Sequence, residues 1–285
     1  MRIVILGSSG LLGKYLTTES IKRNYKTVGI SRTKSDYNLD IRNFEKVDKV
    51  LKSIKPNVII NCIAITDLEY CEKYPLKAFL INTIPLIFLK SFCMKWNITL
   101  LQISTDHFFD NDKKKRHSEN DKVKLLNQYA RTKYAAEVII KEYKKSLIVR
   151  TNFTGFKNYG DPTFIEWLIN MIIKEKKLEL FSDYYTSTID AYTLSKFIFD
   201  VIEKKVYGII NLASSSVVSK KEFGEEIAKL LNKKINLSKR KKKIKNICPR
   251  AKNLGLDITK SEKILERRIP NLEEVCKRLI DEYNF

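Results

Sequence analysis

The chain has 285 residues, 44% hydrophobic and 31% charged, with a formal net charge of +21 at pH 7, a composition that excludes a disordered or low-complexity protein. Its five cysteines form no CxxC pair and it has only two histidines, which argues against a disulfide framework and against a histidine-held metal. We therefore expect a cytoplasmic protein with reduced cysteines, no bound metal and a substantial core.

The first half of the sequence alternates between strand-like and helix-like segments. Short apolar runs predict strands at Arg2–Leu6, Lys26–Ser31, Val58–Ile65, Thr99–Ile103 and Leu147–Thr151. Apolar residues at helical spacing predict helices at Leu12–Asn24, Phe44–Ile54, Ala78–Trp96 and Gln128–Lys145. This alternation is typical of an α/β fold of the Rossmann type, a doubly wound parallel sheet with right-handed crossovers.

The second half of the sequence is mostly helical. The predicted helices are Thr163–Glu175, Thr193–Lys204, Lys220–Leu231 and Asn271–Tyr283. One apolar strand, Tyr207–Leu212, is expected to return to the sheet. The change from alternating strands and helices to mostly helices predicts a Rossmann domain over residues 1–150 and a smaller, mostly helical region over residues 151–285.

The strong positive charge raises the question of a nucleic-acid or membrane partner. The densest basic runs, at 113–116 and 239–245, lack the interleaved aromatic residues that stack on bases. No uninterrupted apolar run approaches the roughly twenty residues that a membrane-spanning helix needs. We therefore expect neither partner.

A glycine-rich loop follows the first predicted strand and opens the first predicted helix. Gly7, Gly10 and Gly13 form a GxxGxxG pattern, which permits a tight turn, a close approach of a pyrophosphate and close packing of helix on strand. In this strand–turn–helix context the pattern predicts a dinucleotide site. The expected cofactor contacts of the loop are Gly7, Ser9, Gly10, Leu11, Leu12 and Gly13.

The end of the second predicted strand indicates which dinucleotide binds. An NAD site usually has an acidic residue there, which binds the ribose 2′-hydroxyl, whereas this chain has Ser31 and Arg32. A hydroxyl and a guanidinium suit a 2′-phosphate. We expect NADPH as the cofactor, with NADH left open, and the alternative for Arg32 is a solvated loop residue.

Two YxxxK pairs occur, Tyr129/Lys133 and Tyr192/Lys196, and helical spacing puts each phenol and ammonium on one face. A nearby ammonium is expected to lower the pKa of the phenol, so that tyrosine can exchange a proton near neutral pH. Tyr129 is the stronger candidate because its helix follows the strand that ends in Ser-Thr-Asp at 104–106, at the sheet edge where ligands bind. Tyr192 is expected to be a packing residue.

Together these motifs resemble an extended short-chain dehydrogenase/reductase, and more closely the dTDP-4-dehydrorhamnose reductase family of nucleotide-sugar 4-ketoreductases. The resemblance extends over nearly the whole chain. The segments that carry it are 7–13, 39–41, 56–64, 104–110, 129–137 and 150–153.

The resemblance implies a role for individual residues. It implies a catalytic set of Thr105, Tyr129 and Lys133. Further cofactor contacts that it implies are Asp40, Ile41, Cys62, Ile63, Ala64, Ser104, Tyr129 and Lys133. The substrate contacts that it implies are Thr105, Asp106, Asn152 and Phe153. Residues 1–150 would then be the NAD(P)-binding domain and residues 151–285 the substrate-binding region.

The expected activity is NADPH-dependent reduction of the 4-keto group of a nucleotide-linked 6-deoxy-4-ketohexose, in deoxysugar or surface-polysaccharide biosynthesis. His107 stands where the family usually has tyrosine, and it either contacts the sugar or forms hydrogen bonds within its loop. The alternatives are a nucleotide-sugar epimerase of the same superfamily and a non-catalytic NAD(P)-binding regulatory subunit. A homodimer is left open.

Overall fold

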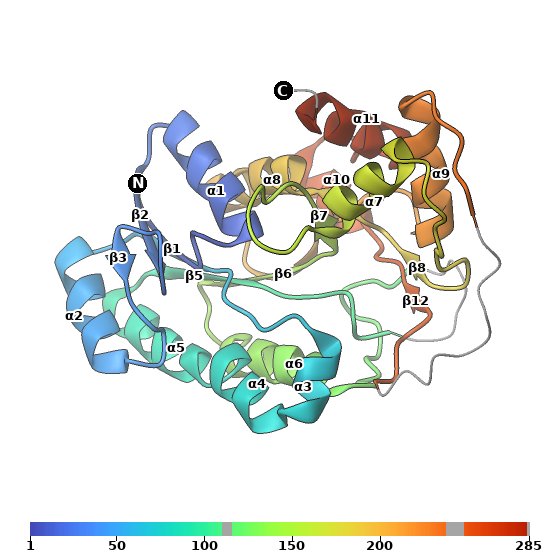
Figure 1. Ribbon diagram of the computed structural model, residues 1–285. Coiled ribbons are helices and arrows are strands. Elements are labelled where there is room, and N and C mark those ends of the chain that lie inside the picture. Colours follow the sequence, from blue (N-terminus) through green and yellow to red (C-terminus); the bar gives the residue numbers. More distant parts are fainter. Residues whose placement is uncertain (110–115, 238–247, 284–285) are drawn as a thin grey trace.

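The computed structural model describes residues 1–109, 116–237 and 248–283, and a seven-stranded sheet forms its centre (Figure 1). The strand order is β10-β6-β5-β4-β1-β2-β3, and every pair is parallel. The strands are β1 (Arg2–Leu6), β2 (Lys26–Ser31), β3 (Tyr37–Asn38), β4 (Val58–Asn61), β5 (Thr99–Ile103), β6 (Ser146–Arg150) and β10 (Gly208–Asn211). The predicted Rossmann-type sheet is confirmed, including the late strand, which returns to pair with β6.

Helices cover both faces of the sheet (Figure 1). One face carries α2 (Phe44–Ile54), α3 (Leu68–Lys73), α4 (Pro75–Asn82), α5 (Pro85–Trp96) and α6 (Gln128–Ile140). The other carries α1 (Leu11–Lys22), α8 (Ala191–Glu203) and α10 (Thr259–Leu265). Because side chains alternate along a strand, Ile3 and Ile5 of β1 enter one core cluster and Val4 and Leu6 enter the other. Burial on both faces explains why the central strands are apolar almost throughout.

The C-terminal part of the chain adds helices and two small sheets beside the central sheet. The helices are α7 (Phe164–Ile173), α9 (Lys220–Leu230) and α11 (Leu272–Tyr283). The short strands are β7 (Phe153–Thr154), β8 (Tyr185–Thr186), β9 (Ile189–Asp190), β11 (Val218–Ser219) and β12 (Asn253–Leu254). The sequence did not predict these strands, because two residues are too few to show a period. One hydrophobic cluster includes both Ile5 and Phe223, so the regions on either side of residue 151 share a core.

The predicted helix Ala78–Trp96 is divided in the structure. The chain forms α4 and α5 instead, and Pro85 is the first residue of α5, where a missing N–H costs nothing. In the described part of the chain, Pro75–Trp96 is the one stretch long and apolar enough to cross a membrane by composition, contrary to expectation. This is weak evidence for a membrane, because buried core helices pass the same test.

Two features of the sequence fall where the structure describes little or nothing. The basic run 239–245 lies wholly outside the described residues, and the run 113–116 lies outside them except for Arg116. Asp110, the last residue of the matching segment 104–110, is also outside them. The expectation about nucleic acid therefore stays a prediction.

Candidate active site

The glycine-rich loop connects β1 to α1 as its spacing predicts. Gly7 has a φ of 84°, in the left-handed region that favours glycine. A Cβ atom on Gly13 would lie 2.1 Å from the Gly7 carbonyl oxygen, so only glycine fits there. Gly10 forms the N-cap of α1 without a side-chain hydrogen bond, and its own N–H donates to the Gly7 oxygen at 2.9 Å. The helix therefore begins at a loop shaped for an anion.

One cavity of about 790 Å³ extends from this loop past the carboxyl ends of β4 and β5 to the C-terminal region. Most residues predicted for the site line it. They are Gly7, Gly10, Leu11, Leu12, Gly13, Cys62, Ala64, Ser104, Thr105, Asp106, Tyr129, Asn152 and Phe153. Tyr192 lies outside this cavity, in α8, where the Lys22 ammonium is 5.4 Å from its ring centroid.

The β4 strand is shorter than predicted, and its end explains how the next residues reach the cavity. The expected strand ran to Ile65, but β4 stops at Asn61. The Asn61 side chain donates to Gln102 at 2.7 Å and accepts from the Ile63 N–H at 3.2 Å. The chain turns out of the sheet at this point, which brings Cys62 and Ala64 to the cavity wall.

The residues predicted around the adenosine half lie apart from this cavity. The Ser31 hydroxyl accepts a hydrogen bond from the Ser9 N–H at 3.1 Å, so the end of β2 is joined to the glycine-rich loop. The Asp40 carboxylate is bound by Arg42, which lowers its pKa to about 2, and the charge of Arg32 acts in the same direction. Ile41 is buried in the core. Their cofactor roles stay predictions.

The three predicted catalytic residues come together at the C-terminal end of β5. Tyr129 and Lys133 lie on α6, and the Tyr129 hydroxyl lies beside Thr105, which follows β5. The Lys133 ammonium donates to the carbonyl oxygen of Ile103 at 2.6 Å. All three side chains are buried.

The pKa of Tyr129 differs from the sequence-based expectation. Burial raises the pKa of Tyr129, and the neighbouring Thr105 hydroxyl opposes the rise only in part. The expected lowering by Lys133 is wrong for this structure, because that ammonium is directed to the backbone of Ile103. Burial also lowers the pKa of Lys133 to about 8. The phenol is therefore protonated at neutral pH, which is the state that a proton donor needs.

Asp106 is a buried carboxyl group just after the end of β5. Burial raises its pKa to about 7, and the hydrogen bonds that it accepts oppose that rise. The Asn152 amide donates to its Oδ2 at 2.9 Å, and Thr188 donates to the Asn152 oxygen at 2.8 Å. This chain of bonds connects β5 to the C-terminal region and places two of the predicted substrate residues side by side.

The structure adds two cationic residues, Lys220 and Arg250, that the predicted site did not include, and it places His107 with them. His107, Lys220 and Arg250 also line the cavity, and the charges of Lys220 and Arg250 act on His107. The His107 ring meets Tyr129 edge-on at 5.5 Å between centroids. Within the described ranges, His107 Nδ1 and Arg250 Nε are buried atoms without a hydrogen-bond partner. No spacing in the sequence could have joined them, because Lys220 and Arg250 are far from His107 along the chain.

Burial and charge keep His107 neutral. Burial lowers its pKa to about 4, and the two cations act in the same direction. Lys220 also has a pKa lowered by burial, to about 8, and its ammonium lies 4.4 Å from the ring centroid of Phe164. The cavity therefore has a neutral imidazole beside Tyr129, and Lys220 and Arg250 also line it.

Comparison with known proteins decides the family. The model of the RmlD substrate binding domain matches residues 1–285. The chain belongs to this family. The chain is also similar to the probable low-salt glycan biosynthesis reductase Agl14 of Haloferax volcanii, with 25% identity over 242 residues, covering 81% of this chain and 80% of the relative.

Two dTDP-4-dehydrorhamnose reductases are also similar to this chain. That of Aggregatibacter actinomycetemcomitans is 26% identical over 78% of this chain and 76% of the relative. The dTDP-4-dehydrorhamnose reductase of Bacillus anthracis has a crystal structure in complex with NADP. Its sequence is 27% identical to this chain, the match covers 99% of both chains, and the TM-score is 0.89. The fold and the family expected from the motifs are thereby confirmed.

Proposed function

We propose that this protein is an NADPH-dependent reductase that acts on the 4-keto group of a nucleotide-linked 6-deoxy-4-ketohexose, in deoxysugar or surface-polysaccharide biosynthesis. The observation that carries the proposal is that Thr105 and Tyr129 lie side by side in the cavity that the glycine-rich loop also lines. The names of the dTDP-4-dehydrorhamnose reductases, one of them in complex with NADP, support the substrate class and the cofactor.

The residues present fit a dinucleotide. At Gly13 a Cβ atom would collide with the Gly7 backbone, and at Gly10 it would lie 3.1 Å from the Gly7 oxygen, so the loop stays open to a pyrophosphate. The buried Lys133 lies at the end of β5, where it would reach the nicotinamide ribose. NADPH, when bound, supplies the hydride for the reduction.

The chain's own residues then handle the carbonyl oxygen and the proton. Thr105 and Tyr129 both line the cavity, so a ketone oxygen placed between their hydroxyl groups would accept two hydrogen bonds. Because burial keeps the Tyr129 phenol protonated, it can give its proton to the alkoxide as charge develops there. Asp106 holds the adjoining loop through its hydrogen bond with Asn152.

The cations of the cavity support a substrate that carries phosphate groups. Lys220 and Arg250 line the cavity, and their charges act on His107. A sugar ring at Tyr129 would leave its diphosphate near these cations, which bind such groups by charge-assisted hydrogen bonds. We expect His107 to contact the sugar itself, through its unpartnered Nδ1.

The deciding experiment incubates the purified protein with NADPH and a panel of 4-keto nucleotide sugars. We expect NADPH oxidation together with a product that mass spectrometry shows to be two hydrogens heavier than its substrate. Absence of NADPH oxidation over the whole panel would contradict the proposal.

The two alternatives predict other results. An epimerase would retain tightly bound NAD+ through purification and would interconvert sugars without net consumption of NADPH. A regulatory subunit would bind the dinucleotide without turnover, and the buried set of Thr105, Tyr129 and Lys133 argues against it because binding alone needs no proton donor.

Assembly and location stay predictions. We expect a cytoplasmic protein without a membrane or nucleic-acid partner, and a homodimer is the first assembly to test. Leu76 on α4 and Ile87 on α5 are 79% and 55% exposed, so these helices form the surface to alter first. Sedimentation velocity of the wild type and of Ile87→Glu measures whether a dimer forms there.

A further inference from the structure

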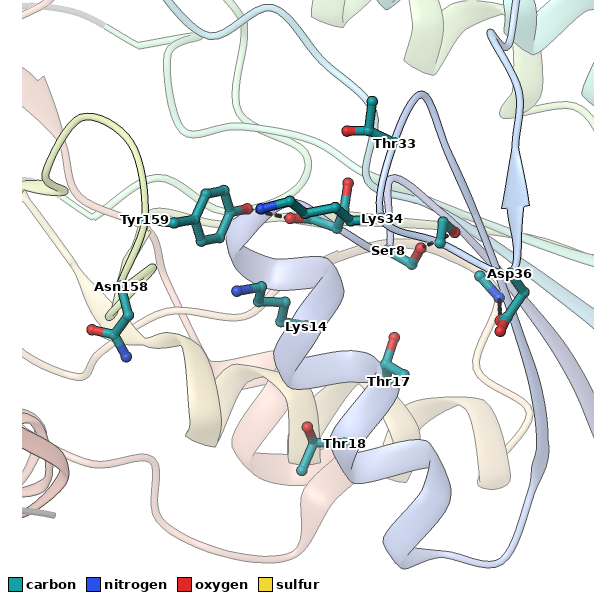
Figure 2. Close-up of a pocket in the computed structure, with 12 residues that line it drawn as sticks. Ser8, Lys14, Thr17, Thr18, Thr33, Lys34, Asp36, Asn158 and Tyr159 are labelled. Carbon is teal, nitrogen blue, oxygen red and sulfur yellow. Dashed lines mark hydrogen bonds between the residues drawn. The ribbon is translucent and has the colours of Figure 1, made fainter.

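A second cavity, of about 930 Å³, lies beside the glycine-rich loop, against α1 and the segment after β2 (Figure 2). It shares no lining residue with the catalytic cavity. Its lining residues include Ser8, Ser9, Lys14, Lys34, Ser35 and Tyr159, together with several threonines. The wall is therefore rich in hydroxyl groups and ammonium groups.

Three lysines gather around one aromatic ring at the side of this cavity. The ammonium nitrogens of Lys14, Lys157 and Lys34 lie 4.0, 5.2 and 5.5 Å from the ring centroid of Tyr159. Figure 2 shows Lys14 and Lys34 directed toward Tyr159 from different elements, α1 and the loop after β2. The ring attracts each cation but does not neutralise it, so the cluster generates a concentrated positive field.

Hydrogen bonds connect this wall to the place where the cofactor ribose is expected. The Tyr159 hydroxyl donates to the carbonyl oxygen of Ser9, and the Ser9 N–H donates to the Ser31 hydroxyl at 3.1 Å. The Ser8 hydroxyl lies 3.2 Å from that of Ser31 and 2.8 Å from that of Ser35. A group attached to the ribose at the end of β2 therefore has the cavity next to it.

The charges of the wall favour an anion. Of the described residues that line the cavity, Asp36 is the only acid, and its carboxylate accepts a hydrogen bond from the Gly29 N–H at 2.7 Å. The serine and threonine hydroxyls around it can donate to phosphate oxygens. Arg32 does not line the cavity, and its charge acts on Asp40 instead.

We propose that this cavity binds the 2′-phosphate of the dinucleotide, with Lys34 and Lys14 as its charged contacts. The ring of Tyr159, from the C-terminal region, holds these two ammonium groups in place. Lys34, rather than Arg32, then determines the preference for NADP over NAD. The inference rests on the dinucleotide part of the proposed function and is independent of the sugar substrate.

Binding of two nucleotides that differ only in the 2′-phosphate tests the inference without any turnover. Isothermal titration calorimetry would compare 2′,5′-ADP with 5′-AMP on the full-length wild type, Lys34→Gln, Lys14→Gln and Arg32→Gln. We expect Lys34→Gln to weaken 2′,5′-ADP about tenfold or more and Lys14→Gln to weaken it less, because each removes a charge-assisted contact. The affinity for 5′-AMP should stay within about twofold.

Two further variants control for general effects. Lys22→Gln removes a cation from the same helix at a position beside Tyr192, and it should leave both affinities unchanged. Tyr159→Phe keeps the ring but removes the bond to Ser9, and it should weaken 2′,5′-ADP by a smaller factor than Lys34→Gln. Circular dichroism would show that the variants are folded.

The other outcomes would overturn the inference. Loss of 2′,5′-ADP binding in Arg32→Gln but not in Lys34→Gln would move the 2′-phosphate to Arg32. If Lys34→Gln weakened inorganic phosphate binding but left the ratio of 2′,5′-ADP to 5′-AMP affinity unchanged, the cavity would be a site for free anions. A wild type that bound neither NADP+ nor NAD+ would defeat the cofactor proposal as well, whereas an inactive enzyme that bound NADP+ through Lys34 would defeat only the reductase proposal.

Discussion

The Glu137 carboxylate and the Arg150 guanidinium form a buried ion pair, with Nη2 2.7 Å from Oε2 and side chains 2% and 3% exposed respectively. Ser104 donates to the other carboxylate oxygen at 2.5 Å. The pair fastens α6, which carries Tyr129 and Lys133, to the last residue of β6 and to the loop that follows β5. It therefore holds the catalytic helix against the sheet.

Removing one partner of this pair should destabilise the fold. Glu137→Gln leaves the Arg150 charge buried without a counterion, which typically costs about 3–5 kcal/mol. Urea denaturation would measure the change in the free energy of unfolding. The double variant Glu137→Gln/Arg150→Met should lose less than the sum of the single variants, because no buried charge is left. A single-variant loss below about 1 kcal/mol would contradict this assignment.

Tyr129→Phe should abolish turnover and leave NADPH affinity nearly unchanged. The hydroxyl delivers the proton, and general acid catalysis typically contributes about 10²–10⁴-fold, whereas the ring and Lys133 still shape the site. Steady-state kinetics and fluorescence titration of NADPH measure the two effects separately. Tyr192→Phe is the matched control, with kcat near that of the wild type, since Tyr192 lies outside the cavity. A Tyr129→Phe enzyme with more than about a tenth of wild-type kcat would refute the role.

Asp106→Asn should stabilise the protein at neutral pH relative to the wild type. Burial raises the pKa of Asp106 from 3.8 to about 7, so between these values the folded state binds more protons than the unfolded state. The contribution of this carboxyl to stability therefore falls as pH rises through that window, and asparagine has no proton to lose.

Thermal unfolding at a series of pH values measures this difference. The difference in melting temperature, Asp106→Asn minus wild type, should rise from pH 4 to pH 7 and then level off. Each kcal/mol of difference in unfolding free energy corresponds to roughly 2–4 °C in a chain of this size. Asp183→Asn, at an exposed acid, is the control and should give a flat difference. A flat difference for Asp106→Asn as well would show that its environment does not penalise the carboxylate.

Gly13→Ala should disrupt the glycine-rich loop. The new Cβ would lie 2.1 Å from the Gly7 oxygen and 2.7 Å from the Ser8 Cα, both backbone atoms that cannot move aside cheaply. We expect a large loss of stability and of NADPH binding, read by thermal unfolding and calorimetry. In Gly224→Ala the nearest atom is the flexible end of Leu180, so that variant should be far milder. Equal effects of the two substitutions would show that the loop tolerates the side chain.

The features that the sequence alone determined are those with a local signal. β1, β2 and β5 begin and end at the predicted residues, because a short apolar run buried on both faces stops at the first turn residue. The glycine spacing located the anion loop, since close approach of the backbone demands glycine wherever the loop is placed. Pro85, which begins α5, was also a local signal of a helix start. The apolar residues at helical spacing on both sides of it led instead to the prediction of one continuous helix.

The tertiary structure alone decided which distant residues share a site and how the pKa values of those residues shift. Lys220 and Arg250 reach His107 only because α9 and the chain before β12 pack beyond the carboxyl ends of the sheet. Lys34, Lys14 and Tyr159 gather around one cavity from three separate segments. The pKa of Tyr129 rises instead of falling, because desolvation depends on everything that packs around the phenol, whereas spacing along a helix reports only its neighbours in the sequence.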